Sequence, residues 1–500
     1  MFGSGRRDIP PLAPTPMQRQ GAAHPGLTPT GMQPAAAQPV QPGVPPQPAA
    51  QDDRIPDGST VLFGNQLHRD AIPPLYDQPP MLCFTGRDGA GRPAQIPFSP
   101  AMLGRHIMLI GGIGTGKTNA INQYLARLRG AMQEDAGAII FDTKGDFYST
   151  FSQPGDIVIS NDETASDHLG RANYWNIFRE IQEGPQLMES ITEIAHALFK
   201  EACERTNQPF FPNAARDIFT ASLWHFMHAR PPRERTNRWL SDFLFGATTA
   251  ELREMLAQYP QFRAMISYIQ NDESAQTQGV LAELQQVIRQ IFVGNFNMHG
   301  TLGLKQITKQ KGGRFVFIEY DLSLGSMLSP IYSLMFDIAI KEAIGRDRTS
   351  GSVFFVTDEF RLLPNLTHID DAVNFGRSLG VKFLIGIQNV EQIYESYGEQ
   401  RARSIMSGFL TTFAFRVNDQ SSRQHIQEGF GKNRKKDSFS NIVASKGLTE
   451  ETREGFVVED WDIANLQLGE AIIGMPGTEP FLFRFDYFDE AQYRAQHPRR

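Results

Sequence analysis

Residues 111–118 read Gly-Gly-Ile-Gly-Thr-Gly-Lys-Thr, directly after the apolar run Ile-Met-Leu-Ile at 107–110. Closely spaced glycines after a buried strand let backbone N–H groups surround phosphates, while the lysine reaches the β- and γ-phosphates and the threonine hydroxyl ligates Mg²⁺. Apolar residues then recur at helical spacing through 121–132. Strand, loop and helix together predict a binding site for ATP and Mg²⁺. Its loop comprises Gly111, Gly112, Ile113, Gly114, Thr115, Gly116, Lys117 and Thr118.

A second apolar run, residues 353–356, ends in Thr357 and the paired acids Asp358 and Glu359. Open α/β sheets place their chemistry at the carboxyl ends of strands. We therefore predict that Asp358 holds Mg²⁺ through its water shell and that Glu359 orients the attacking water. Paired acids at a strand end are also common on ordinary surfaces, so this prediction depends on the phosphate loop.

Two further polar residues, Gln388 and Arg377, are candidates for the same catalytic site. The run at 381–387 ends in Gln388, whose amide can donate to a phosphate and accept from water, which suits a γ-phosphate sensor. A simple turn residue is the alternative. Arg377 is a candidate for stabilising transition-state charge from a neighbouring subunit, and a solvated or carboxylate-paired arginine is the alternative.

Composition narrows the class of protein. A chain of 500 residues predicts about two or three domains. The net charge of −7 means that any contact with nucleic acid must come from a local patch or the inside of a ring.

Cys83 and Cys203 lack disulfide or metal-ligand spacing. The chain shows neither a secretory signal nor an apolar run near the roughly 20 residues of a membrane span. We expect a cytoplasmic protein with no transmembrane segment of its own.

The organisation of the chain changes along its length. Pro, Ala, Gln and Gly dominate 1–56, which predicts a disordered tail that acts either as a tether or as a solvated extension. Continuous apolar runs such as 137–141 predict strands covered on both faces, hence a doubly wound α/β sheet. Helical periodicity replaces strands in the middle of the chain. The predicted domains are a nucleotide-binding domain in two parts (57–182 and 296–490), an all-α insertion (183–295) and a C-terminal tail (491–500).

Taken in order, these motifs resemble the coupling ATPases of type IV secretion and conjugation systems, which belong to the FtsK/HerA group of RecA-like motors. The resemblance spans about residues 80–480. It implies a RecA-like fold, and it implies that Arg377 is an arginine finger and Gln388 a sensor. The matching segments are the phosphate loop, Asp-Thr-Lys-Gly-Asp at 142–146, Phe-Phe-Pro-Asn-Ala-Ala-Arg at 210–216, Asp-Glu-Phe at 358–360, Gly-Arg-Ser-Leu-Gly at 376–380 and Ile-Gln-Asn at 387–389.

The resemblance further implies a homo-hexameric ring that hydrolyses ATP and moves single-stranded DNA, with or without a relaxase, to a type IV secretion channel. Typical members begin with two membrane-spanning helices, and here a proline-rich tail takes that place. We therefore expect recruitment to the periphery of the inner membrane by a partner protein. Two other functions remain open: an FtsK/HerA-like motor on duplex DNA, and a nucleotide-controlled receptor for secreted effector proteins.

A basic run, Lys-Asn-Arg-Lys-Lys at 432–436, predicts an exposed loop. Repeated around a ring, such a loop would bind phosphates through counterion release without reading bases. A solvated charge run with no partner is the alternative.

Overall fold

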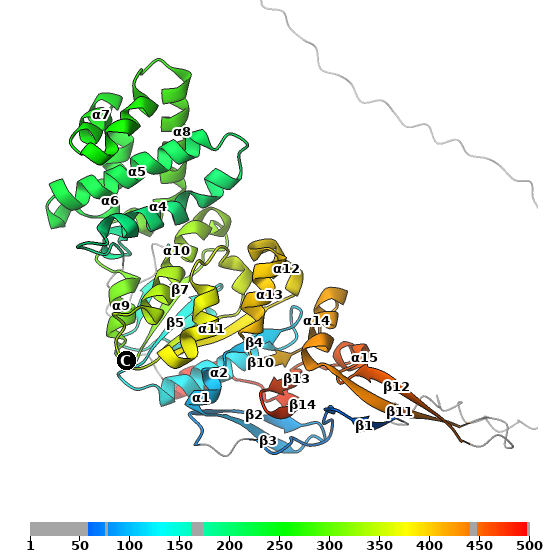
Figure 1. The fold of residues 1–500 in the computed structure, drawn as a ribbon. Coiled ribbons are helices and arrows are strands. Elements are labelled where there is room, and N and C mark those ends of the chain that lie inside the picture. The colour runs from blue at the N-terminus through cyan, green and yellow to red at the C-terminus, as the bar shows by residue number, and fades with distance from the viewer. Residues whose placement is uncertain (1–58, 76–78, 162–173, 441–447, 498–500) are drawn as a thin grey trace, which may run out of the picture. The chain divides into compact units, whose positions relative to one another are not determined.

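The computed structural model describes residues 59–75, 79–161, 174–440 and 448–497 (Figure 1). The tail predicted at 1–56 lies outside these ranges. Within them, every helix is too short or too polar to cross a bilayer.

An eleven-stranded mixed sheet forms the centre of the described chain, in the order β3-β2-β14-β13-β10-β4-β9-β8-β5-β7-β6. The run from β10 to β6 is parallel, and the run from β3 to β13 is antiparallel, including the pairing of β13 with β10. The parallel strands are β4 (Ile107–Ile110), β5 (Gly137–Asp142), β6 (Ile157–Ile159), β7 (Arg314–Glu319), β8 (Val353–Thr357), β9 (Val381–Ile387) and β10 (Thr411–Ala414). The antiparallel strands are β2 (Leu82–Asp88), β3 (Pro93–Phe98), β13 (Glu470–Met475) and β14 (Thr478–Phe485).

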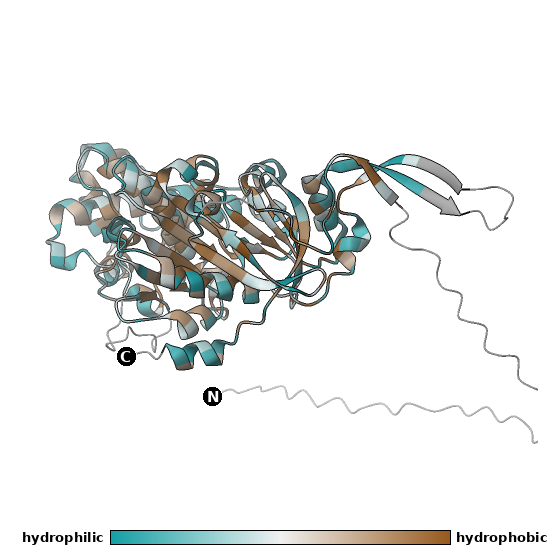
Figure 2. Ribbon diagram, turned by 90° about the horizontal axis from the view of Figure 1, so that it is seen from below, coloured by the Kyte–Doolittle hydropathy of each residue, from teal (hydrophilic) through white to brown (hydrophobic). Residues whose placement is uncertain are grey.

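Helices cover both faces of the parallel half, as the continuous apolar runs predicted. In β4, Ile107 and Leu109 share a core with α2, whereas Met108 and Ile110 share the opposite core with α10. Figure 2 shows hydrophobic residues concentrated along these central strands. The helices around the sheet are α1 (Pro100–Leu103), α2 (Lys117–Ala131), α3 (Asp146–Phe151), α9 (Leu304–Gln310), α10 (Gly325–Ile344), α11 (Ile369–Leu379), α12 (Val390–Tyr397), α13 (Glu399–Ser407), α14 (Gln420–Phe430), α15 (Asp460–Ala464) and α16 (Glu490–Gln496).

A group of helices lies between β6 and β7 in the chain, drawn in green in Figure 1. Their buried apolar side chains, such as Ile194 of α4 and Val287 of α8, join the core that also contains α10. The helices are α4 (Leu187–Glu204), α5 (Phe210–Ala229), α6 (Asn237–Gly246), α7 (Thr249–Ala257) and α8 (Ala275–Ile291), and the 3-10 turns are η1 (Ile177–Arg179), η2 (Pro232–Glu234), η3 (Pro260–Ile269) and η4 (Gly294–Asn297). A further 3-10 turn, η5 (Phe360–Leu362), follows β8.

The basic run at 432–436 is not a loop, so that prediction is wrong. It belongs to β11 (Lys432–Ser440), which pairs on one side with β1 (Ser59–Phe63) and on the other with β12 (Leu448–Phe456). Lys432 pairs with Glu454 at 3.0 Å, and the buried Lys435 pairs with Glu459 at 2.8 Å. Acids on and after β12 thus neutralise part of the run, a pairing that the linear sequence does not reveal.

The last described helix, α16, begins at the last residue of the predicted nucleotide-binding domain and extends into the segment 491–500 that the sequence assigns to a C-terminal tail. Its Tyr493 ring packs against Phe151 of α3, with centroids 5.2 Å apart. Asn122 of α2 donates a hydrogen bond to Glu490 at 2.9 Å. Residues beyond 490 therefore contribute to the face of the sheet that carries α2.

Candidate active site

The loop at 111–118 joins β4 to α2 at the carboxyl edge of the parallel strands. Gly114 and Gly116 have φ values of +73° and +113°, which side chains other than glycine rarely adopt. A Cβ on Gly116 would lie 2.9 Å from the Cα of Gly469, so the backbone there leaves no room for another residue. The shape of the loop itself therefore requires glycine at 114 and 116.

The Lys117 side chain is buried against this loop. Its ammonium donates hydrogen bonds to the carbonyl oxygens of Gly111 and Gly112, the latter at 3.0 Å. Burial lowers the pKa of Lys117, while the negative charges of Glu359 and Asp358 oppose that shift. The ammonium therefore lies within the electrostatic reach of the two acids, where phosphate oxygens can replace the loop carbonyls as its partners.

The strand order β4-β9-β8-β5 brings four strand ends to the same edge of the sheet. Lys117 follows β4, Gln388 follows β9, and Asp358 follows β8. Thr143, which follows β5, donates from Oγ1 to Asp358 Oδ1 at 3.0 Å. Burial raises the pKa of Asp358, and the hydrogen bond from Thr143 only partly offsets this rise.

These residues suit a hard cation. A desolvated carboxylate such as that of Asp358 gains stability from a nearby positive ion, and oxygen ligands are those that Mg²⁺ prefers. The Thr118 hydroxyl, at the start of α2, takes part in none of the side-chain hydrogen bonds found among the described residues. Thr118 and Asp358 are therefore the side chains able to hold Mg²⁺ here.

Each carboxylate oxygen of Glu359 accepts one hydrogen bond from a side chain. The Gln388 amide donates to Oε2, and Arg361 Nε donates to Oε1 at 3.0 Å. The structure therefore brings Gln388 and Glu359 together, because the strands that precede them, β9 and β8, are neighbours in the sheet. Sequence reasoning missed Thr143 and Arg361, since neither residue type marks a site by itself.

Arg377 lies apart from the other predicted residues. It occupies the last turn of α11, which ends immediately before β9 begins. A Cβ on Gly104, just before β4, would lie 3.2 Å from Arg377 Cγ. Arg377 is thus exposed at the amino edge of the sheet, whereas Lys117 lies at the carboxyl edge. Arg377 therefore lies away from the phosphate loop of its own chain.

Asp142 ends β5 and supports the backbone beside the site. Its carboxylate accepts N–H groups from Gly145 at 2.9 Å and Tyr148 at 2.8 Å. Burial raises the pKa of Asp142 to about 7, although the hydrogen bonds from the backbone N–H groups of Tyr148 and Lys144 pull it down. These bonds give Asp142 a structural role at the start of α3, with no chemical step assigned.

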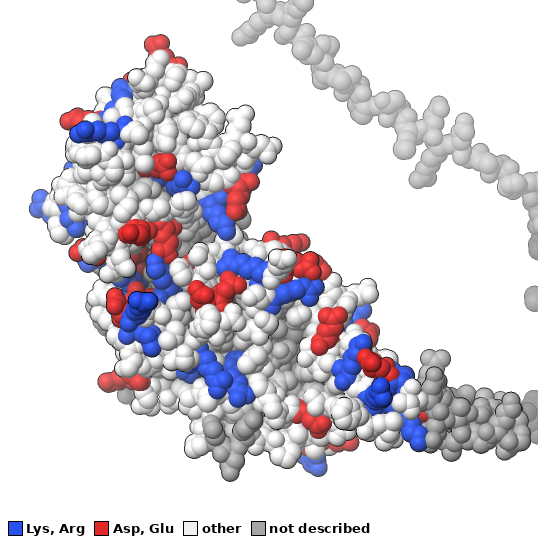
Figure 3. Space-filling view, viewed as in Figure 1, with Lys and Arg blue, Asp and Glu red and all other residues white. Residues whose placement is uncertain are grey.

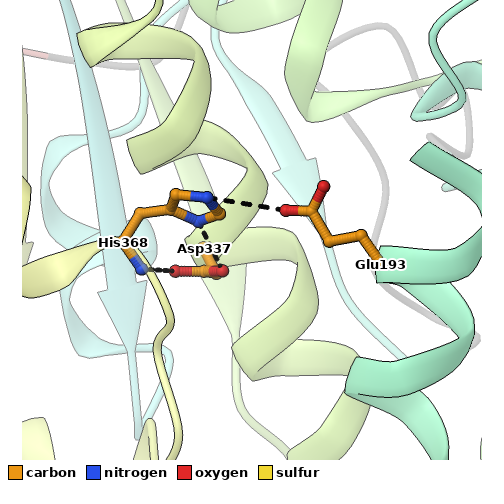
Figure 4. Close-up of side chains that lie close together, drawn as sticks. All are labelled: Glu193, Asp337 and His368. Atoms are coloured by element: carbon orange, nitrogen blue, oxygen red, sulfur yellow. Dashed lines mark hydrogen bonds and ion pairs between the residues drawn. The ribbon is translucent and has the colours of Figure 1, made fainter. Parts of the chain in front are cut away.

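A separate cluster links α4 to the core (Figure 4). His368, which caps α11, contacts Asp337 of α10 through Nδ1 at 2.9 Å and Glu193 of α4 through Nε2 at 3.6 Å. These three residues have ligand atoms close enough to hold a metal ion. However, Lys341 also pairs with Glu193. Lysine and a protonated histidine balance the two carboxylates without a metal, so the cluster is an ion-pair network.

This network predicts a pH dependence. Burial lowers the pKa of His368, but the hydrogen bond and charge of Asp337 and the charge of Glu193 outweigh this effect, so the pKa lies above its ordinary value. The stability gained from protonation is complete below the unfolded-state pKa of about 6.5 and is lost as pH rises through the folded-state value. We expect His368→Gln to destabilise the protein by about 1 kcal/mol at pH 6 and by much less at pH 9. Thermal unfolding at both pH values checks this, with the exposed His497→Gln as control, and an equal loss at both would contradict it.

Charge on the visible surface is mixed. On the face drawn in Figure 3, Lys and Arg side chains are interspersed with Asp and Glu. This face therefore offers no broad basic surface to nucleic acid, which agrees with the net charge of −7.

A strand, a glycine loop, a helix and paired acids on the same sheet edge define a P-loop NTPase fold. The family model described as the type IV secretion-system coupling protein DNA-binding domain matches residues 92–483, and the chain belongs to this family.

Individual relatives agree with this family. Coupling protein TraD of Escherichia coli (strain K12) is 24% identical over 345 residues, which are 67% of this chain and 45% of TraD. The match thus spans less than half of TraD. Plasmid coupling protein TrwB in complex with the ATP analogue ADPNP has a TM-score of 0.62 at 18% identity, covering 86% of this chain and 95% of TrwB. TrwB in complex with ADP and Mg²⁺ has a TM-score of 0.60 at 18% identity, covering 79% and 88%. At such identities the structures establish a shared RecA-like fold, as the motif order predicted.

Proposed function

We propose that this protein is an ATP-hydrolysing motor that couples DNA, alone or as a nucleoprotein with a relaxase, to a type IV secretion or conjugation channel. The observation that carries the proposal is the convergence of Lys117, Asp358, Glu359 and Gln388 on one edge of the sheet. We also propose that the nucleotide-binding domain is built from two parts of the chain with an all-α domain inserted between them. A partner protein is proposed to recruit this motor to the periphery of the inner membrane.

ATP is proposed to bind with its phosphates in the loop at 111–118. The solved TrwB complexes contain ADPNP in one case and ADP with Mg²⁺ in another, which supports the same ligands here. Thr118 and Asp358 would hold Mg²⁺, which neutralises phosphate charge when bound. Lys117 would exchange the carbonyls of Gly111 and Gly112 for phosphate oxygens.

Hydrolysis is proposed to proceed by attack of water on the γ-phosphorus. The bond from this phosphorus to the bridging oxygen breaks, ADP leaves with that oxygen, and inorganic phosphate forms. Glu359 orients the water and accepts its proton, while the Gln388 amide contacts the γ-phosphate. The contact between Gln388 and Glu359 supports a shared response to that phosphate.

The position of Arg377 supports a ring. An exposed arginine one strand length from its own loop, at the opposite edge of the sheet, suits a finger that enters the site of the next subunit. We therefore propose a homo-hexamer in which each site is completed in trans.

DNA is the proposed cargo because the family model is described as a DNA-binding domain, and the resemblance to conjugative coupling ATPases favours single strands. Purified full-length protein should hydrolyse ATP several-fold faster with single-stranded DNA than without it, as measured by phosphate release. Stimulation by duplex DNA alone would favour an FtsK/HerA-like duplex motor. No turnover under conditions that assemble the ring would favour a nucleotide-controlled receptor for effector proteins and contradict the motor.

A further inference from the structure

One contact in the active site is not explained by the proposed chemistry. Arg361 lies in η5, two residues after Glu359, and its Nε donates to Glu359 Oε1 at 3.0 Å. The Gln388 amide holds the other oxygen. Glu359 is thus oriented by two protein donors, and one of them carries a full positive charge.

Such an arrangement opposes the role proposed for Glu359. A residue that positions water and takes its proton needs an oxygen directed at that water. Here a guanidinium occupies one oxygen and attracts the carboxylate toward η5. Gln388 can turn with the γ-phosphate because its amide both donates and accepts, but Arg361 only donates. Of the two contacts, the one with Arg361 thus holds the Glu359 carboxylate toward η5, and its loosening would free the carboxylate to turn toward the water.

The surroundings of Arg361 allow this movement. Its side chain is 42% exposed, whereas that of Glu359 is 13% exposed, so the arginine is the freer partner. Arg361 lines a cavity of about 1590 Å³ between α4 and α10. The cavity gives the guanidinium space away from Glu359.

The segment that carries Arg361 is also joined to the helical group. Lys200 of α4 donates to Asn365 Oδ1 at 2.7 Å, and Glu193 of α4 faces His368. The chain from Glu359 to His368 thus contacts the active site at one end and α4 at the other. A displacement of α4 would act on the η5 segment directly.

We propose that Arg361 is a positioning residue that restrains Glu359 in the resting protein, and that its withdrawal into the α4–α10 cavity releases Glu359 for hydrolysis. This inference rests on the proposed ATPase function. It adds that Arg361 slows ATP hydrolysis in the resting protein and that a movement of α4 would relieve this inhibition.

The test compares Arg361→Ala, Arg361→Lys and wild type as full-length proteins. We expect Arg361→Ala to raise kcat without DNA about fivefold, equivalent to about 1 kcal/mol, with KM for ATP unchanged. The factor by which DNA stimulates turnover should fall accordingly. Arg361→Lys keeps the charge without the guanidinium geometry, so its kcat should lie between the two. Arg346→Ala is the matched control, because Arg346 lines the same cavity without pairing with Glu359.

An unchanged kcat in Arg361→Ala, or an equal rise in Arg346→Ala, would overturn the inference. A lower kcat in Arg361→Ala would also overturn it, by showing that the guanidinium assists the reaction. If the wild-type protein shows no ATP hydrolysis that depends on Lys117, the proposed function is wrong, and the inference about Arg361 falls with it.

Discussion

Lys117→Ala should lower kcat for ATP hydrolysis about 10²–10³-fold, since it removes the buried cation that we propose contacts the phosphates. Lys117 is the only loop residue with a positive side chain, and its ammonium lies within reach of both Asp358 and Glu359. Phosphate release by purified protein, with and without single-stranded DNA, measures the effect. Arg127→Ala removes an exposed cation from the same helix and should retain full activity.

The same variant tests the ring. Lys117→Ala and Arg377→Ala should each be inactive alone, because one lacks its phosphate contact and the other lacks the finger for its neighbour. Mixed together, the two proteins form some sites with an intact loop from one subunit and an intact arginine from the next. Partial recovery of activity on mixing is therefore expected. Activity of Arg377→Ala alone near that of wild type would contradict the role in trans.

Glu359→Gln should lower kcat about 10²–10⁴-fold while nucleotide affinity stays unchanged. The amide keeps the size of the side chain but cannot accept a proton from water, whereas the loop and Lys117 that bind phosphates are untouched. Single-turnover hydrolysis and titration with a fluorescent ATP analogue separate the two steps. Asp371→Asn, which neutralises an exposed acid on α11, serves as control.

An equal loss of binding and turnover in Glu359→Gln would assign this residue to nucleotide binding. If Glu359→Gln hydrolyses ATP nearly as fast as wild type, Glu359 is not the residue that accepts the proton of the attacking water.

The local patterns were sufficient for the nucleotide loop and the acidic strand end. The apolar runs before Gly111 and Asp358 form the buried strands β4 and β8, and the helical spacing after Lys117 forms α2. These elements follow from short stretches of chain, since hydrophobic periodicity and glycine geometry act over a few residues. Gln388 was recognisable for the same reason.

The antiparallel half of the sheet was not recognisable in this way. β13 and β14 come late in the chain, yet they join β10 to β2, which comes before the phosphate loop. Short strands separated by turns reveal that strands exist, but their partners depend on long-range packing. The prediction of an exposed basic loop at 432–436 was wrong for a related reason. Glu454 and Glu459 reach these residues only through the pairing of β11 with β12 and the turn that follows β12.

By itself, the sequence determined that a glycine loop follows a buried strand at 111–118 and that paired acids end a strand at 358 and 359, because each of these features is carried by a contiguous segment. Only the tertiary structure decided that Thr143 and Arg361 join the site and that Arg377 faces away from it. The physical reason is the order of strands in the sheet. That order sets which loop ends meet, and it is fixed by the packing of side chains from distant parts of the chain.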